Sequence, residues 1–245
     1  MPTRVVHLAV DAADPSRLAR FWAAALGWEV AADEPHVANV WPAGFSYPDP
    51  VALPLVFIRV PEAKAGKNRV HLDLATTSAE HQAAQVKRLR DLGATPAGIG
   101  QGEVPWVVLA DPEGNEFCVL DSRPGYRDTG PVAAVVMDCA DPSGLAVFWA
   151  EAAGWQRRDS RDDFASLRSP QDTGPCLELI RTPDSKAVKN RIHLDVAPYK
   201  GDDQAAEVAR LRDLGATLAD IGQGEVPWVV LADPEGNEFC VTTPC

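Results

Sequence analysis

The chain contains one long sequence twice. The segment IGQGEVPWVVLADPEGNEFCV occupies Ile99–Val119 and recurs unchanged at Ile221–Val241, 122 residues later. Weaker matches around it keep their order: ADPSRLARFWAAALGW precedes it in the first half and ADPSGLAVFWAEAAGW in the second. A chain of 245 residues is long for a single core, whereas each half has the size of an ordinary domain. The repeat therefore predicts two tandem copies, residues 1–122 and 131–245, joined by a polar linker at residues 123–130.

Charge and composition restrict the partners. The net charge of −12 opposes binding to a nucleic-acid backbone or an anionic membrane surface, which favours a small organic molecule as the ligand. No apolar run is long enough to span a bilayer, and the first residues lack the apolar stretch of a secretory signal, so we expect a cytoplasmic protein. The five cysteines are an odd set, which indicates reduced thiols rather than a disulfide framework.

Local patterns give the elements of each copy. Alternating apolar residues over Val5–Ala12 predict a strand, and Asp14, Pro15 and Gly27 mark the start and end of a helix. In the first copy we further expect strands at Leu55–Val60, Arg69–Leu74, Val104–Ala110 and Glu116–Leu120, and a helix at Thr77–Leu92 opened by a capping box of Thr77 and Glu80. Each copy therefore reads as two βαβββ units.

This order of elements, with the motifs ADPxxLAxFWxxxLGW, KNRxHLDL and DPEGNEFCV, resembles the vicinal oxygen chelate superfamily and most closely its glyoxalase-like domain branch. That superfamily includes glyoxalase I, extradiol dioxygenases, fosfomycin-resistance enzymes and bleomycin-binding proteins. The resemblance implies an α+β fold in which two βαβββ units form a cupped mixed β-sheet with helices on its convex side. The units can pair within one copy or between copies, which would give a pseudo-dimeric monomer or a homodimer, and the sequence does not choose.

The resemblance also implies a divalent metal, Zn, Fe, Mn or Ni. Metal-binding relatives take ligands from four strand positions, and three of them hold potential ligands in either pairing. Our hypothesis for the first copy is a site of His7 and His71 with Cys118 or Glu116, because these residues share the concave face. The alternative is that each cysteine is a small apolar filler. The four positions are His7, Val56, His71 and Cys118 in the first copy, and Ala134, Glu178, His193 and Cys240 in the second.

The KNRxHLDL strand carries a charged triplet in both copies. Val70, Leu72 and Leu74 take the helix-covered face, which directs the intervening residues to the open face. A histidine there can move a proton while a metal or an arginine polarises an oxygen. The alternative is an internal Arg–Asp pair that holds the sheet. The candidate catalytic residues are Arg69, His71 and Asp73, and Arg191, His193 and Asp195.

Aromatic side chains and two glutamates complete the candidate substrate site. The first copy has five extra residues near WPAGFSYPDPVALP, and a loop of this kind can rim a site. We therefore expect the cup that carries it to be the more elaborated one and to give one tight site per chain. Glu116 and Glu238 point to the same face as the strand cysteines. The candidate substrate-binding residues are Trp41, Phe45, Tyr47, Trp106, Trp228, Glu116 and Glu238.

Two functions follow from the resemblance. The first is a glyoxalase-like enzyme with lyase, isomerase or dioxygenase chemistry on an oxygenated organic substrate. The second is a binding protein of the bleomycin-resistance type, which sequesters an aromatic or antibiotic-like molecule. Incomplete metal positions favour the second function, and the repeated triplet favours the first.

Overall fold

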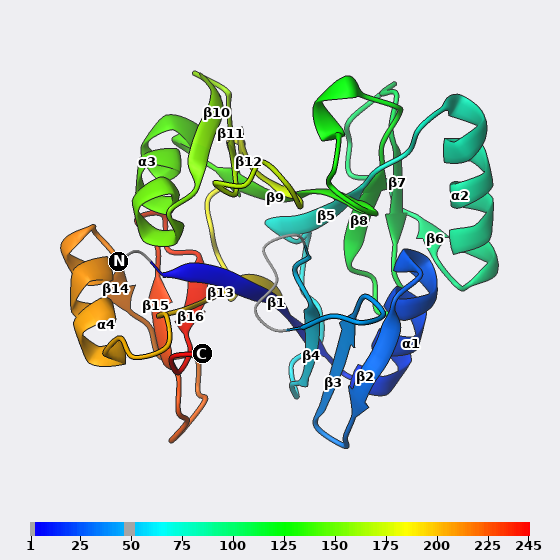
Figure 1. The fold of residues 1–245 in the computed structure, drawn as a ribbon. Helices are drawn as coiled ribbons and strands as arrows, with labels where there is room; N and C mark the ends of the chain where they lie inside the picture. The colour runs from blue at the N-terminus through cyan, green and yellow to red at the C-terminus, as the bar shows by residue number, and fades with distance from the viewer. Residues whose placement is uncertain (1–2, 47–51) are drawn as a thin grey trace.

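The computed structural model describes residues 3–46 and 52–245 and shows two lobes, one from each copy, with helices at their outer sides (Figure 1). The first copy contains β1 (Arg4–Ala12), α1 (Pro15–Leu26), β2 (Glu29–Asp33), β3 (Val37–Trp41), β4 (Leu55–Arg59), β5 (Val70–Leu74), α2 (Ala79–Asp91), β6 (Thr95–Pro96), β7 (Val107–Ala110) and β8 (Glu116–Val119). A short 3-10 helix, η1 (Pro124–Tyr126), lies in the linker. The second copy contains β9 (Val132–Cys139), α3 (Pro142–Ala153), β10 (Gln156–Arg161), β11 (Phe164–Arg168), β12 (Cys176–Arg181), β13 (Ile192–Ala197), α4 (Gln204–Asp213), β14 (Thr217–Leu218), β15 (Val229–Ala232) and β16 (Glu238–Val241).

The sheets form between the copies. One mixed sheet has the order β14-β15-β16-β13-β1-β4-β3-β2, and the other has the order β10-β11-β12-β9-β5-β8-β7-β6. Each sheet thus joins the first unit of one copy to the second unit of the other through an antiparallel pair, β1 with β13 or β5 with β9. We call the concave face of the sheet with β1–β4 and β13–β16 cup A, and that of the sheet with β5–β12 cup B. The predicted α+β fold of paired βαβββ units is confirmed, and the pairing left open by the sequence is the one between copies.

The lobes themselves are held together within each copy. The indole nitrogen of Trp22 on α1 donates to Asp111, the first residue of the DPEGN turn, at 3.2 Å, and the indole ring packs on Phe117 with centroids 5.1 Å apart. The guanidinium of Arg88 on α2 donates to the carbonyls of Ala24 and Ala25 at the end of α1, which satisfies two of its orphan acceptors. The same contacts recur in the second copy, so the repeated motifs encode packing on the outer side of the sheets.

Helix boundaries mostly follow the sequence signals. Asp14 caps α1 by accepting from the backbone N–H of Arg17, and Gly27 ends it with φ +69°, a conformation that glycine adopts without strain. The predicted capping box at Thr77 is wrong by one residue. Ser78 is the N-cap of α2 and accepts from His81 N–H, while the Thr77 N–H donates to the His81 ring.

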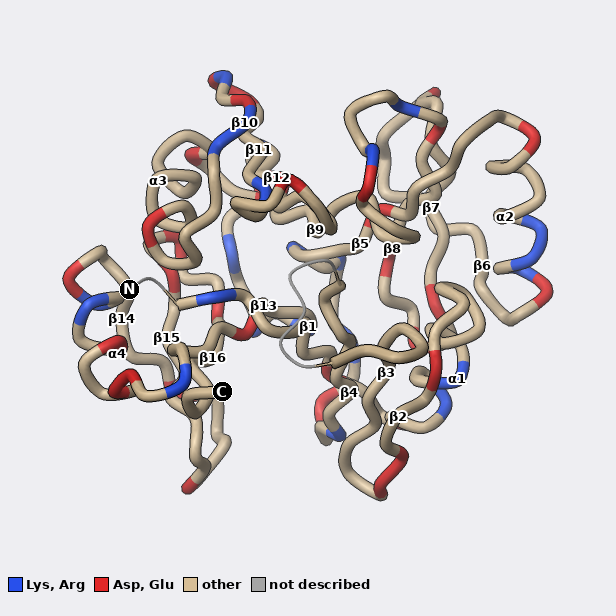
Figure 2. Tube along the Cα trace, viewed as in Figure 1, with Lys and Arg blue, Asp and Glu red and all other residues tan. Residues whose placement is uncertain are grey.

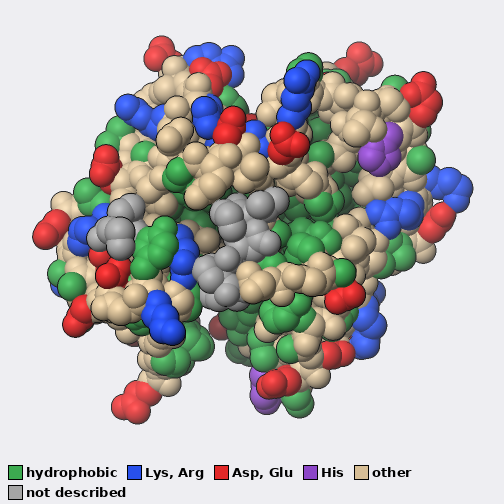
Figure 3. Space-filling view, viewed as in Figure 1, with side chains coloured by type: hydrophobic (Ala, Val, Ile, Leu, Met, Phe, Trp, Pro, Cys, Tyr) green, Lys and Arg blue, Asp and Glu red, His purple; other side chains and the backbone are tan. Residues whose placement is uncertain are grey.

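Three further observations bear on the sequence predictions. All five cysteines lie within the described residues and none of them forms a disulfide bond there, which agrees with the reduced thiols expected. Among the residues that the structure describes, no helix has the length and apolarity to cross a membrane. Acidic and basic positions are spread over both lobes (Figure 2), and apolar surface is interspersed among them on the face drawn in Figure 3. Charge therefore does not single out one face as a site.

Candidate functional site

Each cup carries one cluster of potential ligand atoms at its centre. In cup B it consists of His71, Asp73 and Cys118, and in cup A of the equivalent His193, Asp195 and Cys240. The ligand atoms of each trio lie within 4.8 Å of one another, and all six residues are buried. Strand geometry explains the trios, because a histidine and an aspartate two residues apart face the same side of one strand and the cysteine comes from the parallel neighbour.

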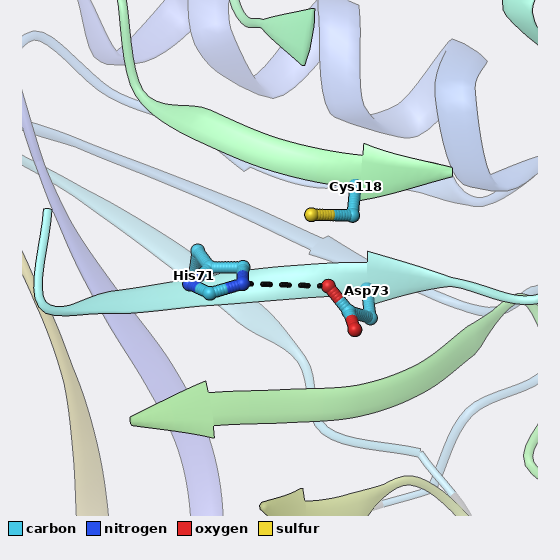
Figure 4. A group of neighbouring side chains, drawn as sticks. All are labelled: His71, Asp73 and Cys118. Carbon is cyan, nitrogen blue, oxygen red and sulfur yellow. Dashed lines mark ion pairs between the residues drawn. The ribbon is translucent and has the colours of Figure 1, made fainter. Parts of the chain in front are cut away.

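In cup B the aspartate is incompletely satisfied. His71 and Asp73 lie side by side on β5, and the sulfur of Cys118 points toward them from β8 (Figure 4). The His71 Nε2 atom is 3.5 Å from Asp73 Oδ1, beyond an ordinary hydrogen bond. Oδ1 is fully buried and has no hydrogen-bond partner among the described residues. Burial, followed by the charge of Asp73, raises the pKa of the Cys118 thiol well above its usual range, so the thiol is protonated in the free protein.

In cup A the corresponding aspartate is shared by two histidines. Asp195 Oδ1 lies 2.7 Å from His193 Nδ1, and Oδ2 lies 2.9 Å from His7 Nε2. Burial alone would raise the pKa of Asp195, but the charge of His193 and bonds from both imidazoles outweigh it and lower the pKa. Burial acts to lower the pKa of His193, and the adjacent carboxylate reverses this into a raised pKa. The network is a His–Asp–His chain in which His193 and Asp195 are buried, His7 is partly buried and both carboxylate oxygens accept hydrogen bonds.

One position creates this difference. In the sheet register, Asp195 pairs with His7 across β13 and β1, and Asp73 pairs with Ala134 across β5 and β9. The hypothesis that His7 and His71 share a metal site is therefore wrong. The two histidines belong to different sheets because the units pair between copies, and His7 joins His193 instead.

The arginines of the predicted triplets lie outside the trios. Arg69 donates to the carbonyls of Asp138 and Asp184, and Arg191 donates to those of Asp11 and Glu62. These partners cross from one copy to the other and line a cavity of about 930 Å³ between the turns at Lys67–Arg69 and Lys189–Arg191, the KNR turns. The contacts correspond to the sheet-holding alternative, although the predicted partners, Asp73 and Asp195, are replaced by backbone carbonyls and by the carboxylates of Glu235 and Glu113.

The two strand glutamates are engaged in structural pairs. Glu116 lies 2.8 Å from the ammonium of Lys64 and accepts from the backbone N–H of Asn68. Glu238 lies 2.7 Å from Lys186 and accepts from the N–H of Asn190. Neither glutamate belongs to the ligand trio of its cup. Their carboxylates hold the KNR turns against β8 and β16.

Glu178 also lies outside the trio of its cup, and its partner comes from the linker. The hydroxyl of Tyr126 donates to Glu178 Oε1 at 3.0 Å. Burial raises the pKa of Glu178 to about 7, although the bond from Tyr126 opposes the shift. Both residues line a cavity of about 600 Å³ that opens between the linker and β10–β12. Sequence analysis missed Tyr126, and its one available signal is that it is the single aromatic residue of a polar linker.

The predicted aromatic residues divide between the cups. Trp41 and Phe45 stack with centroids 5.6 Å apart on the side of cup A, and Tyr47 lies outside the described residues. Trp106 packs on the Cys118 side of cup B, where the guanidinium of Arg123 lies 5.4 Å from its ring centroid. Trp228 is half-buried. The structure does not bring these aromatic side chains together at one site.

The donor sets fit a divalent cation unequally. Imidazole, carboxylate and thiolate are ligands of Zn²⁺ or Fe²⁺, and both trios offer one of each. In cup B a cation would supply the close partner that Asp73 Oδ1 lacks, since its only contact among the described residues is the long one to His71. In cup A the imidazoles already bond both oxygens of Asp195, so a cation would have to displace one of these bonds. Cup B therefore fits a cation better.

Comparison with known proteins agrees with this architecture. A family model described as "Glyoxalase-like domain" matches residues 7–120 and 134–242. Among solved structures, glyoxalase I from Zea mays is 16% identical with a TM-score of 0.68, and the match covers 98% of this chain and 92% of that chain. A putative dioxygenase from Bacillus subtilis is 15% identical with a TM-score of 0.62, over 99% of this chain and 86% of that one. At these identities the likeness shows a shared fold.

No curated protein matches the chain. Because the family model covers most of both copies, the chain belongs to the glyoxalase-like domain family, in the vicinal oxygen chelate superfamily.

Proposed function

We propose that the chain is a glyoxalase-like enzyme that acts on a small oxygenated organic molecule in cup B, with a divalent cation held by His71, Asp73 and Cys118. The observation that carries this proposal is the buried Asp73 Oδ1, which has no hydrogen-bond partner. An unpaired buried carboxylate oxygen is costly, by about 1–3 kcal/mol or more. A cation between the three side chains would remove that cost.

The residues around the trio suit proton transfer to or from a substrate. A bound cation would polarise a substrate oxygen as a Lewis acid. Glu178 reaches the adjoining cavity, and a carboxyl group with a pKa of about 7 can accept or return a proton near neutral pH. The Tyr126 hydroxyl fixes one of its oxygens. Lyase or isomerase chemistry requires a base of this kind, whereas dioxygenase chemistry would rest mainly on the cation.

Cup A supports a second candidate function, the sequestration of an aromatic molecule. The stacked Trp41 and Phe45 offer a flat apolar surface beside this cup. Both oxygens of Asp195 already accept hydrogen bonds from His7 and His193, so the network needs no cation. In this alternative the chain binds its ligand without turning it over, and its metal content is unrelated to ligand binding.

Metal content after reconstitution separates the two functions. The purified chain would be loaded in turn with zinc, iron, manganese and nickel, dialysed, and measured by elemental analysis. We expect stoichiometric cation in the wild type, loss of it in Cys118→Ala and retention in the matched variant Cys240→Ala, since both cysteines are equally buried. Retention in Cys118→Ala with loss in Cys240→Ala would move the site to cup A. A wild type that holds no cation would refute the metal site and favour sequestration.

A further inference from the structure

The linker places a phenol inside cup B. The Tyr126 ring contacts two small groups of buried side chains on the sheet, one around Cys118 and Leu120 and the other around Ala134 and Val136. Its hydroxyl meets Glu178 at 3.0 Å. Apolar walls on both sides of the ring and a carboxylate at its hydroxyl end are the complementary surface that a phenol requires.

The linker is anchored without the Tyr126 side chain. The buried guanidinium of Arg168 on β11 donates to the carbonyl of Arg127, and Gly174 N–H donates to the carbonyl of Asp128 at 2.9 Å. Both contacts use the backbone of the two residues after Tyr126. The phenol ring can therefore be removed or displaced while the linker remains attached to the rim of the cup.

Open space adjoins the ring. The cavity of about 600 Å³ is lined by Tyr126 and Glu178 together with Phe164 and Ser166, on strands that face the linker. In Figure 3 a notch between the two lobes, with Lys or Arg side chains on both sides, opens at the top of the view, where Figure 1 places the linker and β10–β12. A small aromatic molecule could reach Glu178 from this side.

Charge at the rim does not direct the choice of ligand. Arg158 and Arg168 both pair with Asp172, at 2.9 and 3.3 Å, and Arg123 pairs with Asp121 at 2.8 Å. Each of these arginines has a carboxylate partner, and Arg158 and Arg168 share one. At the inner end of the cavity the contacts of Tyr126 are those of a ring and a hydroxyl, so we take these as the features that a ligand must share.

We propose that cup B is a binding site for a phenol, and that Tyr126 occupies it as an internal ligand that a free phenolic molecule replaces. The proposal takes cup B as the substrate site and so rests on the proposed function, whose substrate class it names. A tethered group competes at a high effective concentration, in the millimolar range for short linkers. A free phenol must therefore bind cup B much more weakly in the wild type than in a chain without the Tyr126 ring.

The test is titration of metal-free protein with p-cresol, the free form of the tyrosine side chain, by calorimetry and thermal shift. Tyr126→Ala should gain a saturable p-cresol site that the wild type and Tyr126→Phe lack. Toluene, which has no hydroxyl, should bind that site about 10-fold more weakly, the upper scale of one lost hydrogen bond. In Tyr126→Ala with Glu178→Val, which copies Val56 of the first copy, the preference for p-cresol over toluene should disappear.

No additional site in Tyr126→Ala, or equal binding of p-cresol and toluene, would overturn the proposal. If Tyr126→Ala does not fold alone, refolding with each compound makes the same comparison. Rescue by p-cresol supports the proposal, while no rescue, or equal rescue by toluene, contradicts it. Because a chelator is present throughout, this result is independent of metal content. Failure of the phenol site would leave the cation site of cup B standing, and failure of the cation site would leave the phenol site standing.

Discussion

The two cups have the same His–Asp–Cys trio and differ in how the aspartate is satisfied. Asp195 in cup A accepts from two imidazoles, whereas Asp73 in cup B has an oxygen that accepts no hydrogen bond from the described residues and lies 3.5 Å from His71. The strands that carry the trios are nearly identical, so the difference comes from the strand paired with them, where cup A has His7 and cup B has Ala134. Exchange of units between copies thus lets one duplicated sequence build two chemically different sites.

The largest expected effect is the loss of stability when the aspartate of each trio is substituted. Asp195→Asn should lower the free energy of unfolding by about 3–5 kcal/mol, because it breaks a buried charge network at its centre. The matched Asp73→Asn should cost less than about 1 kcal/mol, since it removes a buried charge that is poorly paired. Urea denaturation of metal-free protein measures both. Equal losses in the two variants would show that the cups are equivalent after all.

Substitution of His7, the position at which the two cups differ, should have a smaller effect on stability. His7→Ala deprives Asp195 Oδ2 of its donor and should cost about 1.5–3 kcal/mol, the range for a hydrogen bond to a charged group. It should also make cup A resemble cup B and raise its affinity for a cation, as measured by elemental analysis of His7→Ala combined with Cys118→Ala. If this double variant binds no more metal than Cys118→Ala alone, the unpartnered oxygen is not what attracts a cation.

The next effect is a pH dependence that Glu178 gives to cup B, because the corresponding position of cup A is Val56 and does not titrate. Burial raises the folded-state pKa of Glu178 to about 7, so its contribution to stability is complete below the unfolded pKa of about 4.3 and is lost as pH rises through 7. The loss should be about 1–3 kcal/mol between these limits. Glu178→Gln cannot titrate and should flatten the stability curve in that window. A curve unchanged by this substitution would mean that Glu178 is ionised in the fold at ordinary acidic pH.

The sequence predicted the fold well because repeats, helix caps and strand alternation are local signals. The trios could also be predicted in part. Strand periodicity places residues 71 and 73 on one face, and the family resemblance aligns Cys118 with a metal position on that face. Partner strands could not be predicted. Both pairings of the βαβββ units bury similar apolar faces, and only the three-dimensional arrangement places His7 opposite Asp195.

Tyr126 and the two arginines show the other limit of the sequence. Strand periodicity predicted Arg69 and Arg191 on the same face as the trios. In the structure their long side chains instead reach backbone carbonyls of the other copy, a contact that strand periodicity cannot predict. Tyr126 lies in a segment whose composition predicts a linker. Its position in cup B depends on the anchoring of that segment by Arg168, a contact between residues about 40 positions apart.

The smallest expected effect concerns ligand binding at cup A. Trp41 stacks on Phe45 beside this cup, and in cup B of the wild type Tyr126 occupies the phenol position at Glu178, so a flat aromatic probe such as 2-naphthol should find one tight site per chain. Trp41→Ala should weaken that site by about 1 kcal/mol, the scale of one aromatic contact, because the partner ring of Phe45 remains. Trp106→Ala, on the side of cup B, should leave it unchanged. Isothermal titration measures site number and affinity together. Two equal sites, or an equal response to both tryptophan substitutions, would contradict an aromatic site confined to cup A and would remove the main support for sequestration there.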